Sequence, residues 1–188
     1  MILALILLVV GLIAGLARGG RIANIATVEI RWPALVFAGL GLQVGAELLA
    51  ATILPQLSGG DAGLGVLAVS YFLLIVFLVI NRRLAGSWFI GVGLALNFVV
   101  IVLNRGMPVS LAAVKAAGLE RAGFLEAAVK HHAMGPETVL GFLGDVIPLP
   151  IVGSVVSLGD VVLGAGIFLL VSSLVRYHPK RSARVRSA

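Results

Sequence analysis

Carboxylate, guanidinium and amide side chains in the second half of the chain have the chemistry to form a binding site. Asp145 and Asp160 lie beside or within apolar sequence, where an unpaired carboxylate is costly. Arg105 is the natural partner for either of them, because a guanidinium can hold a carboxylate through two hydrogen bonds. The candidate polar cluster consists of Asn104, Arg105, Asp145, Asp160 and Asn97. It either binds a ligand or an ion, or it is an ion pair that fastens one segment to another.

Two further groups of polar residues are secondary candidates. Gln43 and Glu47 are one helical turn apart and share a face, and a carboxylate within a membrane helix is a functional hypothesis by default. Alternatively, Glu47 lies near the outer boundary and reaches headgroups or water. His131 and His132, with Glu137 nearby, invite a metal hypothesis, but adjacent helical residues point about 100° apart. We therefore expect no metal site and an interfacial or solvent-facing histidine pair.

Several kinds of chemistry are excluded by missing residues and motifs. Without cysteine, the chain cannot form disulfides, thiolate nucleophiles or cysteine-ligated metal sites. HExxH, Gly-x-Ser-x-Gly and P-loop patterns are absent, so neither a catalytic residue nor a cofactor is expected. The formal charge of +6 comes from short basic clusters at the ends of apolar runs, with no patch interleaved with aromatics. Nucleic acid is therefore not an expected partner.

The composition places these residues in a membrane protein. Hydrophobic residues make up 60% of the chain, charged residues only 12%, and the mean hydropathy is +1.15. A soluble domain needs about a quarter of its residues charged, so lipid must be the solvent for much of this chain. The 24 glycines fit the close approach of membrane helices. We expect an all-α integral membrane protein, with residues 1–188 forming one membrane domain.

Five apolar runs predict about five transmembrane helices. Arginines follow the first and third runs, and a basic tail at 176–188 follows the last. The positive-inside rule therefore puts the N-terminus outside and the C-terminus inside. Residues 22–32 are expected to form an interfacial linker anchored by Trp32, with a short strand as the alternative. The expected spans are residues 1–17, 33–54, 66–80, 87–103 and 151–175.

The segment 104–150 is then extracytoplasmic. An amphipathic helix is expected from Leu111 to about Met134, lying on the outer surface. A second, short helix is expected at 138–143. Residues 146–150 are apolar but contain two prolines, a pattern that predicts a broken, re-entrant segment. Together these features predict a polar pocket in the outer leaflet, roofed by the amphipathic helix.

A family resemblance rests on four stretches taken together. They are Ala17-Arg18-Gly19-Gly20-Arg21, Asn104-Arg105-Gly106-Met107-Pro108-Val109, Gly144-Asp145-Val146-Ile147-Pro148 and the Gly159-Asp160 pair. With these stretches the chain resembles an uncharacterised bacterial membrane family known as domain of unknown function five-three-one-seven. The resemblance covers nearly the whole chain. It implies a small multi-pass protein of the bacterial cytoplasmic membrane, and it supplies no activity, substrate or catalytic residue.

The functional expectation is a non-enzymatic membrane protein with a polar site on its extracytoplasmic side. It would act as a scaffold or accessory subunit, or as a component of a small permease, within a homo-oligomer or a larger complex in the lipid bilayer. The alternative is a membrane enzyme acting on a lipid-borne or anionic substrate at the outer leaflet. Arg105 would then recognise the substrate, and Asp145 or Asp160 would act as acid or base.

Overall fold

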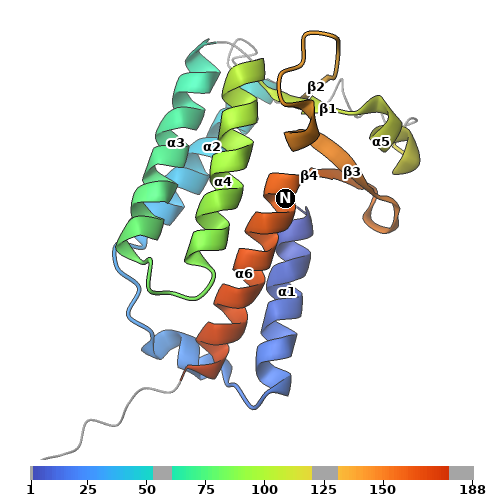
Figure 1. The fold of residues 1–188 in the computed structure, drawn as a ribbon. Coiled ribbons are helices and arrows are strands. Elements are labelled where there is room, and N and C mark those ends of the chain that lie inside the picture. Colours follow the sequence, from blue (N-terminus) through green and yellow to red (C-terminus); the bar gives the residue numbers. More distant parts are fainter. Residues whose placement is uncertain (1, 53–60, 120–130, 178–188) are drawn as a thin grey trace, which may run out of the picture.

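A helical bundle carries a small sheet at one end (Figure 1). The computed structural model describes residues 2–52, 61–119 and 131–177. The α-helices are α1 (Ile2–Ala17), α2 (Ala34–Thr52), α3 (Asp61–Ile80), α4 (Ser87–Asn104), α5 (Leu111–Ala116) and α6 (Leu158–Arg176). The strands are β1 (Met107–Val109), β2 (His131–Ala133), β3 (Asp145–Leu149) and β4 (Ser154–Ser157). Short 3-10 helices lie at η1 (Ile22–Thr27), η4 (Gly141–Leu143) and η5 (Pro150–Val152).

Three of the described helices, α3, α4 and α6, are long and apolar enough to cross a membrane. This finding indicates membrane association and agrees with three of the five predicted spans. α1 is apolar but has 16 residues, which cover about 24 Å, whereas a bilayer core is about 30 Å thick. The apolar part of α2 is also shorter than a full span. For these two helices, membrane crossing stays a prediction.

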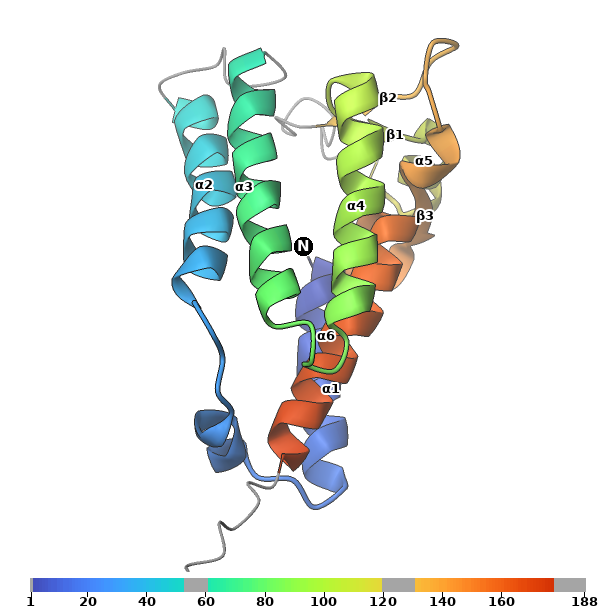
Figure 2. The same ribbon diagram turned by 60° about the vertical axis from the view of Figure 1, so that its left-hand side comes forward.

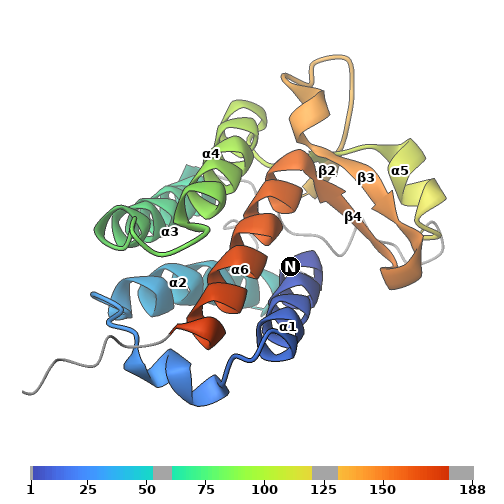
Figure 3. The ribbon, with the colours of Figure 1, turned by 60° about the horizontal axis from the view of Figure 1, so that its bottom comes forward.

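α6 is the central helix of the bundle, with α1 on one side and α4 on the other (Figure 3). Glycines allow both contacts to be close. A Cβ on Gly11 of α1 would lie 2.9 Å from the carbonyl oxygen of Phe168 in α6. A Cβ on Gly93 of α4 would lie 2.5 Å from the carbonyl oxygen of Gly159. The glycine content expected to permit close helix packing therefore acts at two specific interfaces.

α2 packs along α3, on the far side of the bundle from the sheet (Figure 2). The Ser70 hydroxyl, fully buried, donates to the carbonyl oxygen of Gly39 at 2.8 Å. The Gln43 amide in turn donates to the Ser70 hydroxyl, also at 2.8 Å. Gln43, a secondary candidate for function, is therefore part of a polar contact between two helices. The backbone of Glu47 lies in α2, and its side chain is outside what the structure describes.

The small sheet corrects the all-α prediction. Its order is β2-β1-β3-β4, with β1 parallel to β2 and β3, and β3 antiparallel to β4. The expected broken, re-entrant helical segment at 146–150 is largely strand β3. Pro148 is tolerated because β1 pairs with β3 only at Val109 and Asp145, which leaves no second ladder beside the proline. β-Branched residues at 146, 147, 155 and 156 favour strands on both sides of the turn.

Three other predicted helical segments are also corrected. Ser110 caps α5 by accepting from the backbone N–H of Ala113, but this helix ends at Ala116. The predicted continuation toward Met134 falls partly on residues 120–130, which lie outside the described residues. The residues after this gap, His131–Ala133, form strand β2 instead of a helix. The helix expected at 138–143 is reduced to η4, and the last span starts at Leu158 rather than 151, because β4 occupies the residues before it.

The basic connections lie at the end of the bundle opposite the sheet (Figure 1). The linker after α1 forms η1 and not the alternative strand. It is attached to the end of α6, because the backbone N–H of Arg21 and the amide of Asn24 both donate to the carbonyl oxygen of Val175, at 2.9 and 2.7 Å. The turn carrying Arg82 and Arg83 lies at the same end. The two ends of the molecule are therefore chemically different, one basic and one built around the sheet.

Candidate functional site

Asp145 is the most deeply buried carboxylate among the residues that the structure describes. It is the first residue of β3 and has only 3% of its surface exposed. β1 flanks it at Val109, and β4 flanks it at Ser157. Its carbonyl oxygen accepts from the backbone N–H of Ser110 at 3.0 Å. The sheet therefore holds Asp145 between two strands, with its side chain in the interior.

One oxygen of the Asp145 carboxylate has a partner, and the other has none among the described residues. Oδ2 lies 3.4 Å from Nε2 of His131, which is one-third exposed. Oδ1 is buried without a hydrogen-bond partner. A buried polar atom without a partner is rare in proteins and costs about 1–3 kcal/mol. The site therefore has the capacity to accept a proton or another positively charged group.

Burial raises the pKa of the Asp145 carboxyl group. The hydrogen bond and the charge of His131 oppose this effect, and the negative charge of Asp160 adds to it. Asp145 is therefore a carboxylate that binds protons more readily than an exposed aspartate does. Such perturbed groups are enriched at functional sites.

Asp160 is close enough for its charge to act on Asp145, but it has a different environment. Its backbone N–H donates to the Ser157 hydroxyl at 2.9 Å, and its carboxylate accepts from the backbone N–H of Ser157 at 3.4 Å. This capping box begins α6. The Asn97 amide on α4 donates to Asp160 Oδ1, and the Ser157 hydroxyl donates to Asn97 Oδ1, both at 2.8 Å. Asp160 thus caps the N-terminus of α6 and links α6 to α4 through Asn97.

We call the residues gathered here the inner cluster. It contains three of the five predicted site residues together with one of the secondary candidates. The predicted pairing of Arg105 with Asp145 or Asp160 is wrong, because the Arg105 guanidinium contacts Asp61 at 3.1 Å instead. The inner cluster consists of Asn97, His131, Asp145, Ser157 and Asp160.

A shallow cavity of about 350 Å³, which we call the outer pocket, is lined by four of the other predicted residues: Asn104, Arg105, His132 and Glu137. Asn104 fastens this region, since its amide donates to the carbonyl oxygen of Val139 at 2.8 Å and accepts from the Val139 N–H at 2.9 Å. His131 and His132 are adjacent in strand β2, where successive side chains point to opposite faces. One therefore reaches Asp145 and the other the outer pocket. The pocket is lined by Leu103, Asn104, Arg105, His132, Ala133, Gly135, Pro136, Glu137 and Thr138.

A model of the family of unknown function DUF5317 matches residues 27–172. The chain belongs to this family. Comparisons with curated proteins and with solved structures found no match. The resemblance carried by the sequence motifs is therefore confirmed. The DUF5317 region contains every residue of the inner cluster and of the outer pocket.

The described part of this DUF5317 chain, residues 2–52, 61–119 and 131–177, contains no cluster of three or more histidine, aspartate or glutamate side chains that could jointly ligate a metal ion. Asp145 and Asp160 share the inner cluster with a single histidine. The chemistry that the inner cluster offers is therefore exchange of a proton or binding of one small cation.

Sequence reasoning missed Ser157 and Asp61. The first could have been found, because Ser157 and Asp160 have the Ser-x-x-Asp spacing of a capping box. Asp61 lies 44 residues before Arg105, at the start of α3, and no local pattern joins the two. The partner of an exposed arginine depends on how helices are arranged, which the sequence does not encode locally.

Replacing Arg105 by glycine is expected to stabilise the folded DUF5317 protein. Arg105 ends α4 with a φ of 56°, in the left-handed region that favours glycine. Relief of this conformation contributes about 1–2 kcal/mol, whereas the exposed ion pair with Asp61 contributes about 0–1 kcal/mol. Thermal unfolding in detergent micelles should therefore show a gain of about 1 kcal/mol for Arg105→Gly.

Asp61→Asn is the matched control, because it removes the same ion pair without changing the backbone. We expect a change within about 0.5 kcal/mol, as is usual for exposed pairs. A loss above about 2 kcal/mol for Asp61→Asn would contradict this account. It would mean that the Arg105 contact carries more than a surface ion pair does.

Proposed function

We propose that this chain is a non-enzymatic, multi-pass membrane protein that binds a proton or a small monovalent cation at Asp145. The observation that carries the proposal is the unpartnered Oδ1 atom of a carboxylate with only 3% of its surface exposed. A buried anion needs a hydrogen-bond donor, a proton or a cation to offset its lost hydration. The occupant supplies that missing interaction.

The surroundings of Asp145 favour a positively charged occupant. Asp160 lies near enough for its negative charge to act on Asp145. Two neighbouring carboxylates disfavour both being charged without a cation between or beside them. His131 contacts only Oδ2, at 3.4 Å, so the second oxygen remains available. His131 is also one-third exposed, which gives the site a connection to the surface.

In the proposed orientation the inner cluster faces the extracytoplasmic side. The sheet and the basic connections lie at opposite ends of the bundle (Figure 1). Arg18, Arg21, Arg82, Arg83 and Arg176 all lie toward the basic end, which the positive-inside rule assigns to the cytoplasm. This supports an outward N-terminus and an inward C-terminus in a bacterial cytoplasmic membrane. The chain then acts as an accessory subunit or a small permease component.

The catalytic alternative has weaker support. It needs Arg105 to hold an anionic substrate next to Asp145 or Asp160. The guanidinium instead contacts Asp61, and both of these side chains are largely exposed. Asp160 is engaged by Asn97 and by the start of α6. We therefore assign ion binding, not acid–base catalysis, to the inner cluster.

Asp145→Asn is expected to abolish a pH dependence of stability that the wild-type protein shows. Because burial raises the pKa of Asp145, the folded protein binds a proton that the unfolded chain has already released. This holds between the ordinary pKa and the raised one. Stability should therefore fall as pH rises through that interval and stay lower above it. The amide cannot ionise, so thermal unfolding of Asp145→Asn should lack this slope.

Glu137→Gln provides the control, since Glu137 is an exposed acid at the same end of the molecule. Its pH profile should match that of the wild type. Thermal unfolding at a fixed pH above the interval, with increasing Li⁺, Na⁺ or K⁺ at constant ionic strength, tests the cation. A stabilising cation whose effect disappears in Asp145→Asn supports cation binding. An Asp145→Asn variant with the same pH slope and the same cation response as the wild type would refute the proposal.

A further inference from the structure

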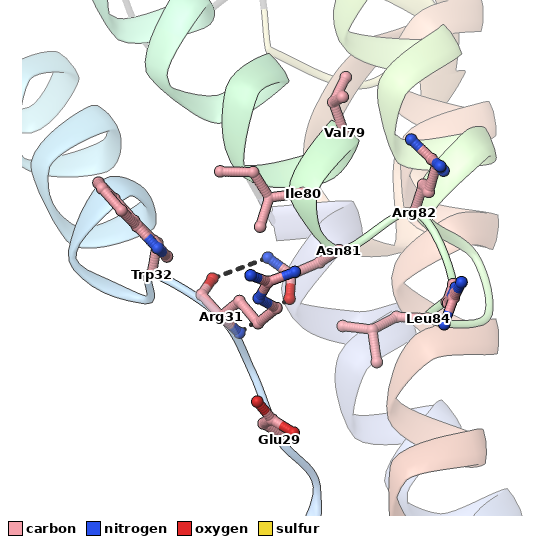
Figure 4. Close-up of a pocket in the computed structure, with 9 residues that line it drawn as sticks. Glu29, Arg31, Trp32, Val79, Ile80, Asn81, Arg82 and Leu84 are labelled. Atoms are coloured by element: carbon pink, nitrogen blue, oxygen red, sulfur yellow. Dashed lines mark hydrogen bonds between the residues drawn. The ribbon is translucent and has the colours of Figure 1, made fainter.

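A second cavity, of about 780 Å³, lies at the basic end of the bundle, away from the inner cluster (Figure 4). Three arginines and one glutamate line it, so its lining carries two net positive charges. The lining residues come from the linker before α2 and from the end of α3 with the turn that follows. They are Glu29, Arg31, Trp32, Val79, Ile80, Asn81, Arg82, Arg83 and Leu84. We call this cavity the basic pocket.

The wall of the basic pocket is held in place by a buried amide. Asn81 is 4% exposed, and its side chain bonds both backbone polar groups of Arg31 (Figure 4). The Arg31 N–H donates to Asn81 Oδ1 at 2.9 Å, and Asn81 Nδ2 donates to the Arg31 carbonyl oxygen at 2.8 Å. Two reciprocal hydrogen bonds thus fix the linker against the end of α3. The pocket is therefore a built feature and not a chance gap between loops.

The next residue, Trp32, has a strained backbone. Its φ is 55°, a left-handed conformation that is unfavourable for a tryptophan and unusual directly before a proline. Strain of this kind persists where the surroundings hold it, often at ligand sites. Here it leaves the Trp32 side chain 66% exposed beside the pocket. Tryptophan is favoured at membrane–water interfaces, which is where this pocket lies if α3 and α4 span the bilayer.

The arginines of the basic pocket have unused binding capacity. Among the described residues, the guanidinium groups of Arg31, Arg82 and Arg83 make no hydrogen bond or ion pair. Arginine is well suited to phosphate, because its planar donors match the oxygens of that group. The chemistry of the pocket therefore fits a phosphate ester.

An apolar groove of about 380 Å³ adjoins the basic pocket along α3 and α4. The two cavities share Val79 and Arg82 in their linings. Trp88, which is 72% exposed, lies in the groove wall, as does Gly91, whose missing side chain leaves space. The groove residues are Ile75, Leu78, Val79, Arg82, Ser87, Trp88, Gly91, Val92 and Ala95. A basic pocket beside an apolar groove has the arrangement of a headgroup site with room for a chain.

We propose that the basic pocket and the groove together bind one anionic phospholipid. The phosphate contacts Arg31, Arg82 and Arg83, and one acyl chain lies in the groove between α3 and α4. Charge complementarity selects an anionic lipid, because a zwitterionic headgroup would place its own cation beside the three arginines, whereas the phosphate charge of an anionic lipid is not offset. The site is independent of the inner cluster, so it goes beyond the proposed function.

Lipid binding to the full chain in detergent, followed by native mass spectrometry, tests the headgroup contact. Phosphatidylglycerol should be retained in preference to phosphatidylcholine. The double variant Arg82→Gln with Arg83→Gln should bind it about a hundredfold more weakly, about tenfold for each of the two charged contacts that are lost. Arg18→Gln with Arg21→Gln is the matched control, because these arginines lie at the same end but outside the pocket. Equal losses in both double variants would overturn the proposal.

Gly91→Leu tests the groove and separates a lipid from a free phosphate. A Cβ at Gly91 would meet only Leu78, at an ordinary 3.7 Å, so the larger side chain fills the groove without displacing backbone. It should weaken phosphatidylglycerol binding and leave the binding of glycerol phosphate unchanged. If glycerol phosphate binds the wild type as tightly as the lipid does, the site is a free-anion site and the lipid proposal is wrong.

The wild-type protein provides a test that needs no variant. Phosphatidylglycerol with a photoreactive group on its acyl chain should crosslink to residues 75–79 and 88–95, and excess unlabelled phosphatidylglycerol should compete. Crosslinks spread evenly over all of the exposed helix faces would overturn the proposal, because they would indicate bulk solvation by lipid.

Discussion

Gly93→Ala is expected to destabilise the protein by about 3 kcal/mol, the upper part of the range for overpacking in a closely packed interior. A Cβ at Gly93 would lie 2.5 Å from the carbonyl oxygen of Gly159 and 2.6 Å from two atoms of Leu163. Two of these three atoms belong to the backbone of α6, which cannot move aside as a flexible side chain can. The methyl group must therefore push α4 and α6 apart. Unfolding by heat or by sodium dodecyl sulfate in micelles measures the loss.

The same displacement should weaken the inner cluster. Asn97 is one helical turn after Gly93 and contacts both Asp160 and Ser157 at 2.8 Å. Separation of α4 from α6 lengthens these hydrogen bonds, so Gly93→Ala should also alter the environment of Asp145, which lies beside Ser157 in the sheet. The pH profile of stability should shift together with the unfolding temperature.

Gly91→Ala is the matched control for this prediction. It makes the same chemical change on the same helix, two residues away, where the added methyl group meets only a side-chain carbon of Leu78 at 3.7 Å. Its stability should equal that of the wild type or exceed it, because alanine favours a helix over glycine by about 1 kcal/mol. Equal losses for Gly91→Ala and Gly93→Ala would contradict the interface as described.

The helices were predictable because their signal is local and repeated. Apolar runs at 33–54 and 87–103 correspond to α2 and α4 within about two residues. α3 begins five residues before the predicted start, at Asp61, since a short glycine-rich stretch continues the helix. Long apolar runs of this kind are easily predicted to be helices, because a bilayer permits few alternatives to a helix.

The sheet was not predictable by the same reasoning. Each of its strands has three to five residues, too few for a clear alternation of polar and apolar positions. β3 also contains Pro148, which argues against a central strand when only the sequence is known. The ladder joins Met107 to His131 and Val109 to Asp145. Such pairings between distant segments depend on tertiary structure.

The candidate site was predictable in its residue types and not in its pairings. Asp145 and Asp160 were identified because carboxylates next to apolar sequence need a partner. Their partners are His131 and Asn97, and the predicted partner Arg105 contacts Asp61. Arginine was the chemically reasonable choice. The side chain of Arg105 nevertheless lies at the exposed end of α4, with 71% of its surface accessible, and Asp61 at the start of α3 is the carboxylate within its reach.

Asp160→Ala is expected to destabilise the protein by about 3 kcal/mol, since a charged hydrogen bond contributes about 1.5–3 kcal/mol and a helix cap about 1 kcal/mol. The substitution removes the carboxylate that accepts from Asn97 and from the N–H of Ser157. It also leaves the amide of Asn97, which is 7% exposed, without its acceptor. The negative charge that favours the first turn of α6 is lost as well. The free energy of unfolding in micelles measures the combined loss of the hydrogen bonds, the helix cap and the favourable charge.

Asp160→Asn separates the contributions of shape and charge. The amide oxygen can still accept from Asn97, so this variant should lose less stability than Asp160→Ala. Asp145→Asn should behave differently from both, because it removes a buried charge whose Oδ1 has no partner among the described residues. Above the interval in which Asp145 titrates, this variant should be as stable as the wild type or more stable.

The comparison of the two aspartates decides which of them is structural. If Asp160→Ala unfolds easily while Asp145→Asn folds normally and loses its response to pH and cations, Asp160 holds α4 to α6 and Asp145 binds the ion. The reverse outcome would exchange these roles. In that case a carboxylate with several hydrogen-bond partners would be the functional group, and an unpartnered buried one would be needed only for folding. Because an unpartnered buried charge opposes folding, the second outcome would require an occupant at Asp145 that stabilises the folded protein.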